Sequence, residues 1–288
     1  MSQIENHKNV KVAYSPDTDD AFMMIPLMEK NIDWRGWNFE FVSADIQELN
    51  EAAASSVYDI TAISVAAYPS MSQKYYMAPV GASIGDQFGP VVVVKADSQI
   101  DSIRALSRKK IAVPGEKTSA YFAARAVLPE FEPVFMLFSD IEQAVLSGEV
   151  DAGVLIHELQ IEIEGSELRK IGDLGALWSE KFDKLPLPLG TNAISKRFNR
   201  EELSVLLDIL RESIRYSFSH RDEVLAKAID SANPGMKMEK GQKYIDMYVN
   251  EHALTFTDSV KAGIQTLYDE GFKAGLCPKM SSSEYLVE

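Results

Sequence analysis

Short apolar runs and helix-like segments alternate along the chain, and the alternation occurs twice in similar order. Residues 12–22 align without gaps on residues 111–121, and each stretch passes from an apolar strand through a tight turn into the start of a helix. Short oxygen-bearing side chains cap the free amides at helix starts, and both turns carry them: Asp19 or Asp20 in the first, Thr118 or Ser119 in the second. The pattern predicts a repeated strand–turn–helix unit.

A second pair of matching segments follows in each half. A helix-like stretch at 46–54 leads through a break to the apolar strand 57–63, and 141–148 leads in the same way to 150–156. An Asp stands near the start of each strand. Strands that alternate with helices pair in parallel through right-handed crossovers. We therefore expect two similar α/β lobes, each built on a largely parallel sheet.

Two further apolar stretches predict how the lobes are joined. The β-branched run 89–94 follows a Gly-Pro break and is expected to leave lobe one, and 185–195 is expected to return to it. Amphipathic helices after residue 199 should then pack on lobe one. The predicted fold class is α/β, two-lobed, with a double crossover between the lobes. Lobe one comprises residues 1–94 and 193–288, and residues 95–192 form the inserted lobe two.

Composition and charge exclude several classes of function. The 46% hydrophobic and 25% charged residues are typical of a globular protein, and the net charge of −14 argues against a nucleic-acid partner. The single cysteine, Cys277, excludes an intramolecular disulfide and a multi-thiolate zinc site. No apolar run is long enough to span a membrane, and the polar N-terminal stretch lacks the core of a secretory signal. We expect a cytoplasmic protein, and the oligomeric state stays open.

In open α/β sheets, ligands bind beyond the carboxyl ends of the strands, where helix N-termini present free amides. The loop 114–119 offers the hydroxyls of Thr118 and Ser119 at such a place, suited either to a carboxylate or phosphate or to simple helix capping. The string Gly-Glu-Lys-Thr in this loop suggests a phosphate-binding P-loop, but Glu116 stands where that motif requires its second glycine. A P-loop ATPase is therefore excluded.

Ser15, Asp17 and Asp20 in the loop 15–20 are further candidate ligand contacts. The carboxyl groups of Asp17, Asp19 and Asp20 could bind a cation, cap the helix or hydrogen-bond to sugar-like hydroxyls. The spacing of a calcium-binding EF-hand is absent, and a metal is the weaker alternative. Ser64 ends a predicted strand at the same crevice. Gln87 precedes the crossover and is either a ligand contact or a surface residue. We also expect contacts from Gly89 in that loop and from Ile156 at a strand end.

His157 directly follows the strand 150–156, which ends at the predicted cleft, and Glu158 stands beside it. An imidazole with its ordinary pKa of about 6.5 is mostly neutral at pH 7 and suits a general base. The alternative is a structural histidine. Glu158 either orients the ring or points away from it.

These strings together carry a family resemblance. The marks are Tyr14-Ser-Pro with Asp20-Ala-Phe22, Phe88-Gly-Pro90, Gly115-Glu-Lys-Thr-Ser119, Asp151-Ala-Gly-Val-Leu-Ile-His-Glu158 and Leu185-Pro-Leu-Pro-Leu-Gly190. By them the chain resembles the 1,4-dihydroxy-6-naphthoate synthases of menaquinone biosynthesis, a group with the two-lobed, type II periplasmic-binding-protein-like fold. The resemblance implies a lyase without cofactor or metal that converts cyclic dehypoxanthine futalosine, a small carboxylate-bearing substrate, into the naphthoate. It places the base at His157 and a hydroxyl pocket at Ser64, Thr118 and Ser119.

One loop departs from the family's pattern. The family commonly has Ser-Pro-Cys-Pro-Asn-Asp-Thr-Phe where this chain has Ser-Pro-Asp-Thr-Asp-Asp-Ala-Phe, at residues 15–22. A divergent substrate within the group is one consequence. Two alternatives share the fold: a solute-binding protein for a small organic anion, and an enzyme like chorismate dehydratase. Because function resides in the site, the fold alone does not separate them.

Overall fold

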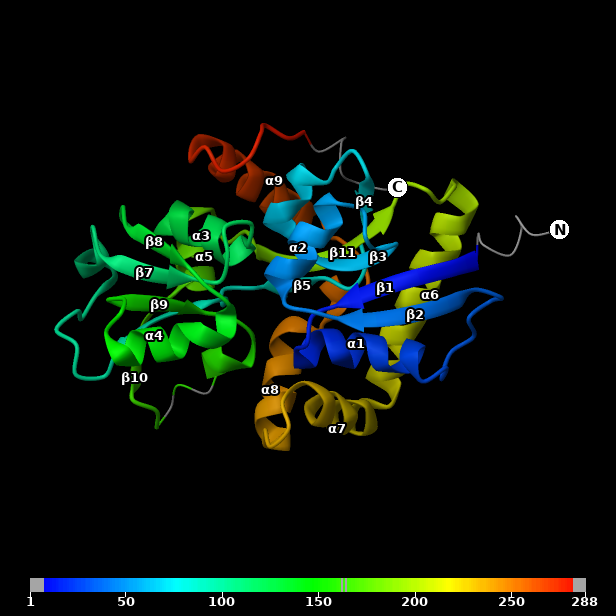
Figure 1. The fold of residues 1–288 in the computed structure, drawn as a ribbon, viewed down its shortest axis with the longest axis horizontal. Helices are drawn as coiled ribbons and strands as arrows, with labels where there is room; N and C mark the ends of the chain where they lie inside the picture. The colour runs from blue at the N-terminus through cyan, green and yellow to red at the C-terminus, as the bar shows by residue number, and fades with distance from the viewer. Residues whose placement is uncertain (1–7, 162, 164, 282–288) are drawn as a thin grey trace.

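The computed structural model describes residues 8–161, 163 and 165–281, and it contains two mixed β-sheets in two lobes that lie side by side (Figure 1). The first sheet, in lobe one, has the strand order β2-β1-β3-β11-β4, with β5 paired to β11; the second, in lobe two, has the order β10-β6-β9-β7-β8. The strands of the first are β1 (Asn9–Tyr14), β2 (Asn38–Ser43), β3 (Ile60–Ser64), β4 (Tyr75–Met77), β5 (Ser83–Gly85) and β11 (Leu187–Ser195). Those of the second are β6 (Val91–Lys95), β7 (Lys110–Val113), β8 (Glu132–Phe135), β9 (Ala152–Leu155) and β10 (Leu168–Asp173).

The sequence repeat corresponds to one folding unit used twice. In lobe one, β1 pairs in parallel with β2 and β3, and α1 (Thr18–Met28) and α2 (Ile46–Ala54) connect these strands. In lobe two, β7 pairs in parallel with β8 and β9, through α3 (Ser119–Val127) and α4 (Ile141–Ser147). The predicted two-lobed α/β fold is therefore confirmed. The expectation of largely parallel sheets was wrong, because the strands that pair with β6 and β11 all do so in the antiparallel direction.

The strands that cross between the lobes run against their neighbours. β6 is antiparallel to β9, and β11 is antiparallel to β3. The run after Gly89 therefore pairs inside lobe two, and the return strand pairs inside lobe one. The chain crosses near residues 86–90 and 182–186, a few residues before the boundaries expected at 94 and 192. A β-branched run indicates a buried strand without indicating which sheet it joins.

The helices after the return strand mostly cover lobe one. They are α6 (Arg200–Ser219), which begins with a capping box of Asn199 and Glu202, α7 (Arg221–Ala232), α8 (Met238–Tyr248) and α9 (Asp258–Lys273). Helix α9 contacts β11 but also α3, so it spans both lobes, whereas the sequence places it on lobe one. The largest apolar core likewise continues from lobe one into lobe two, through residues of α3 and α9. This shared core joins the lobes along one side of the cleft.

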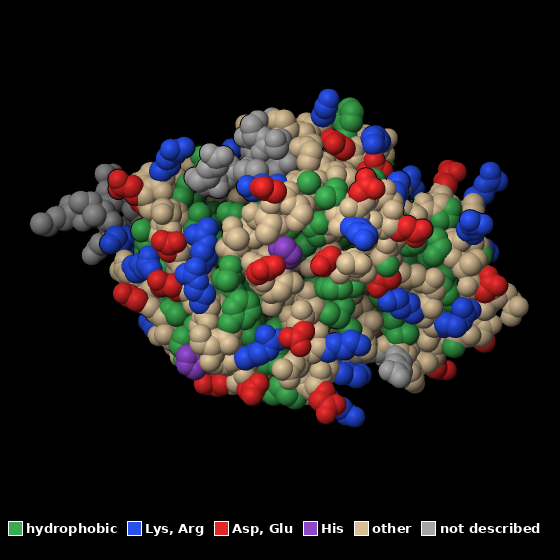
Figure 2. Space-filling view, turned by 180° about the vertical axis from the view of Figure 1, so that it is seen from behind, with side chains coloured by type: hydrophobic (Ala, Val, Ile, Leu, Met, Phe, Trp, Pro, Cys, Tyr) green, Lys and Arg blue, Asp and Glu red, His purple; other side chains and the backbone are tan. Residues whose placement is uncertain are grey.

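The remaining elements are short. They are α5 (Leu174–Lys181) and the 3-10 helices η2 (Val65–Ser70), η3 (Ile103–Leu106), η4 (Phe138–Asp140), η5 (His157–Ile161) and η6 (Glu251–Ala253). No helix within the described residues has the length and apolarity needed to cross a membrane. On the face drawn in Figure 2, basic side chains are interspersed with acidic ones instead of forming a broad basic area.

Candidate active site

A pocket lies between the lobes, at the carboxyl ends of the parallel strands of both sheets. It encloses about 660 Å³ of space, part of it open to solvent. Eight of the ten residues predicted from the sequence line it: Ser15, Asp17, Asp20, Ser64, Thr118, Ser119, Ile156 and His157. The loops after β1, β3, β7 and β9 supply these eight, because equivalent loops of the two repeats face each other.

The other two predicted contacts do not line the pocket. Gln87 is exposed in the turn before the crossover, with a positive φ of 64°. Gly89 is buried against the backbone of Gly175, whose nitrogen would lie 2.9 Å from a Cβ at that position. The glycine is thus required by close backbone packing, which a sequence string does not distinguish from a ligand contact.

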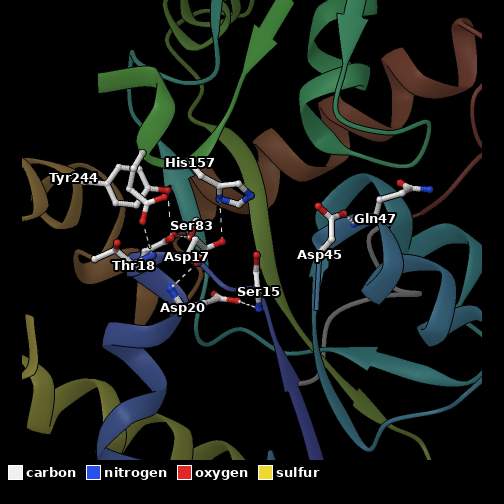
Figure 3. A network of polar contacts seen from close by, with 11 residues as sticks. Ser15, Asp17, Thr18, Asp20, Asp45, Gln47, Ser83, His157 and Tyr244 are labelled. Atoms are coloured by element: carbon white, nitrogen blue, oxygen red, sulfur yellow. Dashed lines mark hydrogen bonds and ion pairs between the residues drawn. The ribbon is translucent and has the colours of Figure 1, made fainter. Parts of the chain in front are cut away.

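An ion pair between His157 and Asp17 is the chemical centre of the pocket. The imidazole Nδ1 lies 2.9 Å from the Asp17 carboxylate, and Figure 3 shows the ring reaching from the segment after β9 to the loop before α1. The other oxygen of Asp17 accepts the Asp20 amide at 3.0 Å and caps α1. The ring's Nε2 is buried with no hydrogen-bond partner among the described residues, and His157 has a strained φ of 53°. The loop that departs from the family's pattern is therefore the one that pairs with the histidine.

The pair changes the charge expected for His157. Burial alone lowers the pKa of His157, but the adjacent carboxylate of Asp17 raises it to about 9. Burial raises the pKa of Asp17, yet the imidazolium beside it brings that pKa below its ordinary range. A pKa of about 9 favours the protonated ring at pH 7. The expectation of a mostly neutral ring was wrong, because the ordinary pKa takes no account of a buried carboxylate at hydrogen-bond distance.

The two neighbouring aspartates are favoured in their neutral form. Burial and the charge of Asp17 raise the pKa of Asp20 to about 8, and they raise that of Asp19 well above its ordinary value. Asp19 accepts hydrogen bonds from the hydroxyls of Ser83, at 2.6 Å, and Tyr244, at 3.2 Å. Asp20 accepts the Ser15 amide at 2.8 Å. The acidic loop consequently carries much less negative charge than its sequence indicates.

The same cluster is the place where a cation would fit best among the described residues. One ligand atom each of Asp17, Asp19 and His157 lie within 4.8 Å of one another. The charges there already balance, since the imidazolium faces the ionised Asp17. A cation would have to displace that ring, so the geometry favours the ion pair over a metal.

The hydroxyls of Thr118 and Ser119 are engaged within the protein. Thr118 donates to the Gly115 carbonyl at 2.8 Å and accepts the amide of Tyr121, which makes it the cap of α3. Ser119 donates to the Leu189 carbonyl at 2.6 Å and accepts the amide of Ala66 at 3.1 Å. The first two amides of α3, at 119 and 120, have no carbonyl one turn back in the helix, and both residues line the pocket. A ligand can therefore bind the amides at 119 and 120, whereas the hydroxyl protons of Thr118 and Ser119 are already donated within the protein.

The hydroxyl proton of Ser64 has no acceptor among the residues that the structure describes. Its hydroxyl accepts from the Asn50 side chain at 3.1 Å, and its amide donates to the same side chain at 2.9 Å. The two contacts fix Ser64 at the end of β3 and leave its hydroxyl able to donate to a ligand.

Sequence reasoning missed one wall of the pocket. Tyr244 and Tyr248 come from α8, and the Tyr248 hydroxyl donates to Gln160 of lobe two at 2.8 Å. The two tyrosines stand four residues apart, so one helix face carries both, but this spacing is equally typical of a core face. Leu189, Gly190 and Thr191 of β11 complete the lining.

Of the two alternatives for Glu158, the structure fits the one in which its side chain does not orient the imidazole ring. Its carboxylate is buried and accepts the Thr18 amide of lobe one at 2.6 Å. Burial and the charge of Asp17 raise the pKa of Glu158. The residue therefore contacts the loop that carries Asp17 and not the imidazole ring.

Comparison with known proteins gives a consistent result. A family model described as menaquinone biosynthesis matches residues 10–273. The 1,4-dihydroxy-6-naphtoate synthase of Thermus thermophilus is 29% identical over 267 residues, which cover 93% of this chain and 95% of that protein. The protein of the same name from Streptomyces coelicolor is 28% identical over 278 residues, covering 94% and 95%.

Solved structures support the fold. A crystal structure of a protein from Archaeoglobus fulgidus is 40% identical, with a TM-score of 0.87, and the match covers 93% of this chain and 98% of that one. The periplasmic aliphatic sulphonate binding protein of Escherichia coli is 16% identical, with a TM-score of 0.68 and coverage of 98% and 92%, and it indicates the fold alone. With a family match over most of its length, this chain belongs to the menaquinone biosynthesis family and has the periplasmic-binding-protein-like fold.

Proposed function

We propose that this chain is a 1,4-dihydroxy-6-naphthoate synthase, which forms the naphthoate from cyclic dehypoxanthine futalosine in the pocket between its lobes. The observation that carries the proposal is the buried His157–Asp17 pair in a pocket lined by both lobes: the imidazole Nε2 has no hydrogen-bond partner in the part of the chain that the structure describes. The names of the relatives from Thermus thermophilus and Streptomyces coelicolor support the same reaction.

His157 is the general base in this proposal. Nε2 takes a proton from a carbon of the cyclic substrate, and the electron pair left behind expels the sugar-derived part of the substrate as the bond to that part breaks. The remaining ring becomes aromatic, so no bound electron sink is required. Asp17 holds Nδ1 and stabilises the imidazolium that forms. With a pKa of about 9, roughly 1% of the rings are neutral at pH 7, but each neutral ring is a stronger base than an ordinary imidazole.

The substrate carboxylate binds at the start of α3. None of the described residues that line the pocket is Lys or Arg, so the amides at 119 and 120, the dipole of α3 and the Ser64 hydroxyl supply the favourable contacts. The raised pKa values of Asp19 and Asp20 keep nearby carboxyl groups neutral and reduce repulsion of an anion.

The test is to incubate the purified protein with cyclic dehypoxanthine futalosine and to follow naphthoate by absorbance and mass spectrometry. Catalytic formation of 1,4-dihydroxy-6-naphthoate is expected. Saturable binding of small organic anions without any turnover of the futalosine would instead support a solute-binding protein. Turnover of chorismate would support the dehydratase alternative.

A further inference from the structure

The His157–Asp17 pair is divided between the two lobes. Asp17 lies in the loop between β1 and α1 of lobe one, and His157 begins η5 of lobe two. Their 2.9 Å contact therefore exists only when the lobes are close together. Proteins of this fold open and close by hinge motion, and a separation of a few ångströms would remove the contact.

A second contact joins the same two segments. Glu158 follows His157 directly, Thr18 follows Asp17 directly, and the Glu158 Oε1 accepts the Thr18 amide at 2.6 Å. Both residues are buried, with 7% of Glu158 and 0% of Thr18 exposed. Thr18 is the first residue of α1, so its amide has no partner within the helix. A buried carboxylate needs such a donor, and the N-terminus of a helix favours negative charge.

We propose that Glu158 is a positioning residue: by docking on the Thr18 amide across the cleft, it brings the Asp17 carboxylate against His157 and so assembles the catalytic pair when the lobes close. This inference extends the proposed function, because the pair it assembles is the base of that reaction. The hydrogen bond from Tyr248 to Gln160 also joins η5 to lobe one, but it does not involve the loop that carries Asp17.

Other titratable groups lie near the pair but do not link its two residues. Asp19 and Asp20 belong to α1 and contact Ser83, Tyr244 and the Ser15 amide. Asp45 caps α2 through the Gln47 amide, and Figure 3 shows it across the pocket from His157. Among these groups, only Glu158 links the two residues: it follows His157 in the sequence, and it accepts a hydrogen bond from Thr18, which follows Asp17.

The sharpest test uses two variants of one residue. Thr18→Pro removes the amide that Glu158 accepts, and the first position of a helix tolerates proline because its amide has no intrahelical partner. Asp17 before it has the extended backbone, φ −121° and ψ 165°, that precedes proline readily. Thr18→Val keeps the amide and removes only the hydroxyl, which is buried beside the Glu158 carboxylate without a hydrogen bond of normal geometry among the described residues. The valine variant is the matched control.

The readout is the titration of His157 by NMR in unliganded protein, beside small-angle scattering. In Thr18→Pro the pKa of His157 is expected to fall from about 9 toward 6.5 or lower, and the radius of gyration to rise. In Thr18→Val both are expected to stay at the wild-type values. A titration near pH 9 with an unchanged radius in Thr18→Pro would overturn the proposal.

Variants of Glu158 separate docking from charge and serve if Thr18→Pro does not fold. Glu158→Gln keeps an acceptor for the Thr18 amide, whereas Glu158→Ala removes it. Docking predicts that the glutamine variant retains most of the raised His157 pKa and the alanine variant loses it. Equal losses in both would mean that Glu158 acts only through its charge, which contradicts the proposal. None of these readouts needs turnover, so a negative result is distinct from failure of the naphthoate assay.

Discussion

Replacing Asp17 by asparagine removes the charge beside His157 while keeping the size of the side chain. Asparagine is as good a helix cap as aspartate, so the Asp20 amide keeps its acceptor and α1 keeps its start. Without the carboxylate that raises its pKa to about 9, His157 is expected to return toward the ordinary value of 6.5, because burial lowers the pKa while Glu158 and Asp19 still raise it. The variant should therefore fold normally and differ mainly in the chemistry of the ring.

The magnitude follows from the fraction of neutral imidazole. With a pKa of about 9 the neutral fraction is about 0.01 at pH 7 and about 0.8 at pH 9.5; with a pKa of 6.5 it is about 0.8 and about 1. If neutral His157 is the base, the ratio of wild-type to Asp17→Asn kcat/KM should grow by about 60-fold between pH 7 and pH 9.5.

The assay is naphthoate formation at subsaturating substrate across this pH range, with Asp20→Asn as the matched control. Asp20 has a pKa of about 8 and is mostly protonated at pH 7, so asparagine resembles the form already present. Its profile should follow the wild type near neutral pH. A ratio for Asp17→Asn that does not change with pH would refute the reasoning, since it would mean that the titration of His157 does not control the reaction.

Three further predictions concern metal, closure and the start of α3. EDTA is expected to leave the reaction rate unchanged; loss of rate that a divalent ion restores would assign a cation to Asp17, Asp19 and His157. Saturating substrate or product should reduce the radius of gyration only slightly in the wild type, whose lobes the His157–Asp17 and Glu158–Thr18 contacts already hold together, and more clearly in Thr18→Pro; an unchanged radius in both would count against hinge closure. Thr118→Ala should lower the free energy of unfolding by about 1 kcal/mol, because α3 loses its cap. Substrate affinity should stay nearly intact, because the backbone amides remain. Thermal unfolding and calorimetric binding measure the two effects, and a large loss of affinity without destabilisation would assign the hydroxyl to the ligand.

The repeat made much of the fold predictable. Residues 12–22 and 111–121 became β1–α1 and β7–α3, and since the carboxyl ends of parallel strands meet at one edge, the loops after them could be placed at one cleft from the sequence. The crossover strands were harder, because a Val-rich run pairs equally well in either sheet. Strands β6 and β11 each enter a lobe from the side of the cleft, where the neighbouring parallel strands end. They therefore run antiparallel to β9 and β3.

The chemistry of the site was less predictable than its location. His157 and Asp17 were both candidates, but 140 residues separate Thr18 from Glu158, and no local pattern indicates which residues of opposite lobes meet. The pKa of His157 depends on that meeting. Tyr244 likewise reaches Asp19 across 225 residues. Helix spacing places Tyr244 on an amphipathic face and says nothing of the loop it contacts.

The central claim is that His157 removes a proton from the substrate, and single-turnover naphthoate formation by His157→Asn tests it most directly. Asparagine keeps a polar group of similar reach for Asp17, so folding and much of the substrate affinity should persist, as thermal unfolding and calorimetry will show. The account predicts a rate of naphthoate formation lower by roughly 10²-fold or more, the usual scale for loss of a general base. A variant that forms naphthoate at nearly the wild-type rate, with only substrate binding weakened, would contradict the claim and reduce His157 to a binding contact.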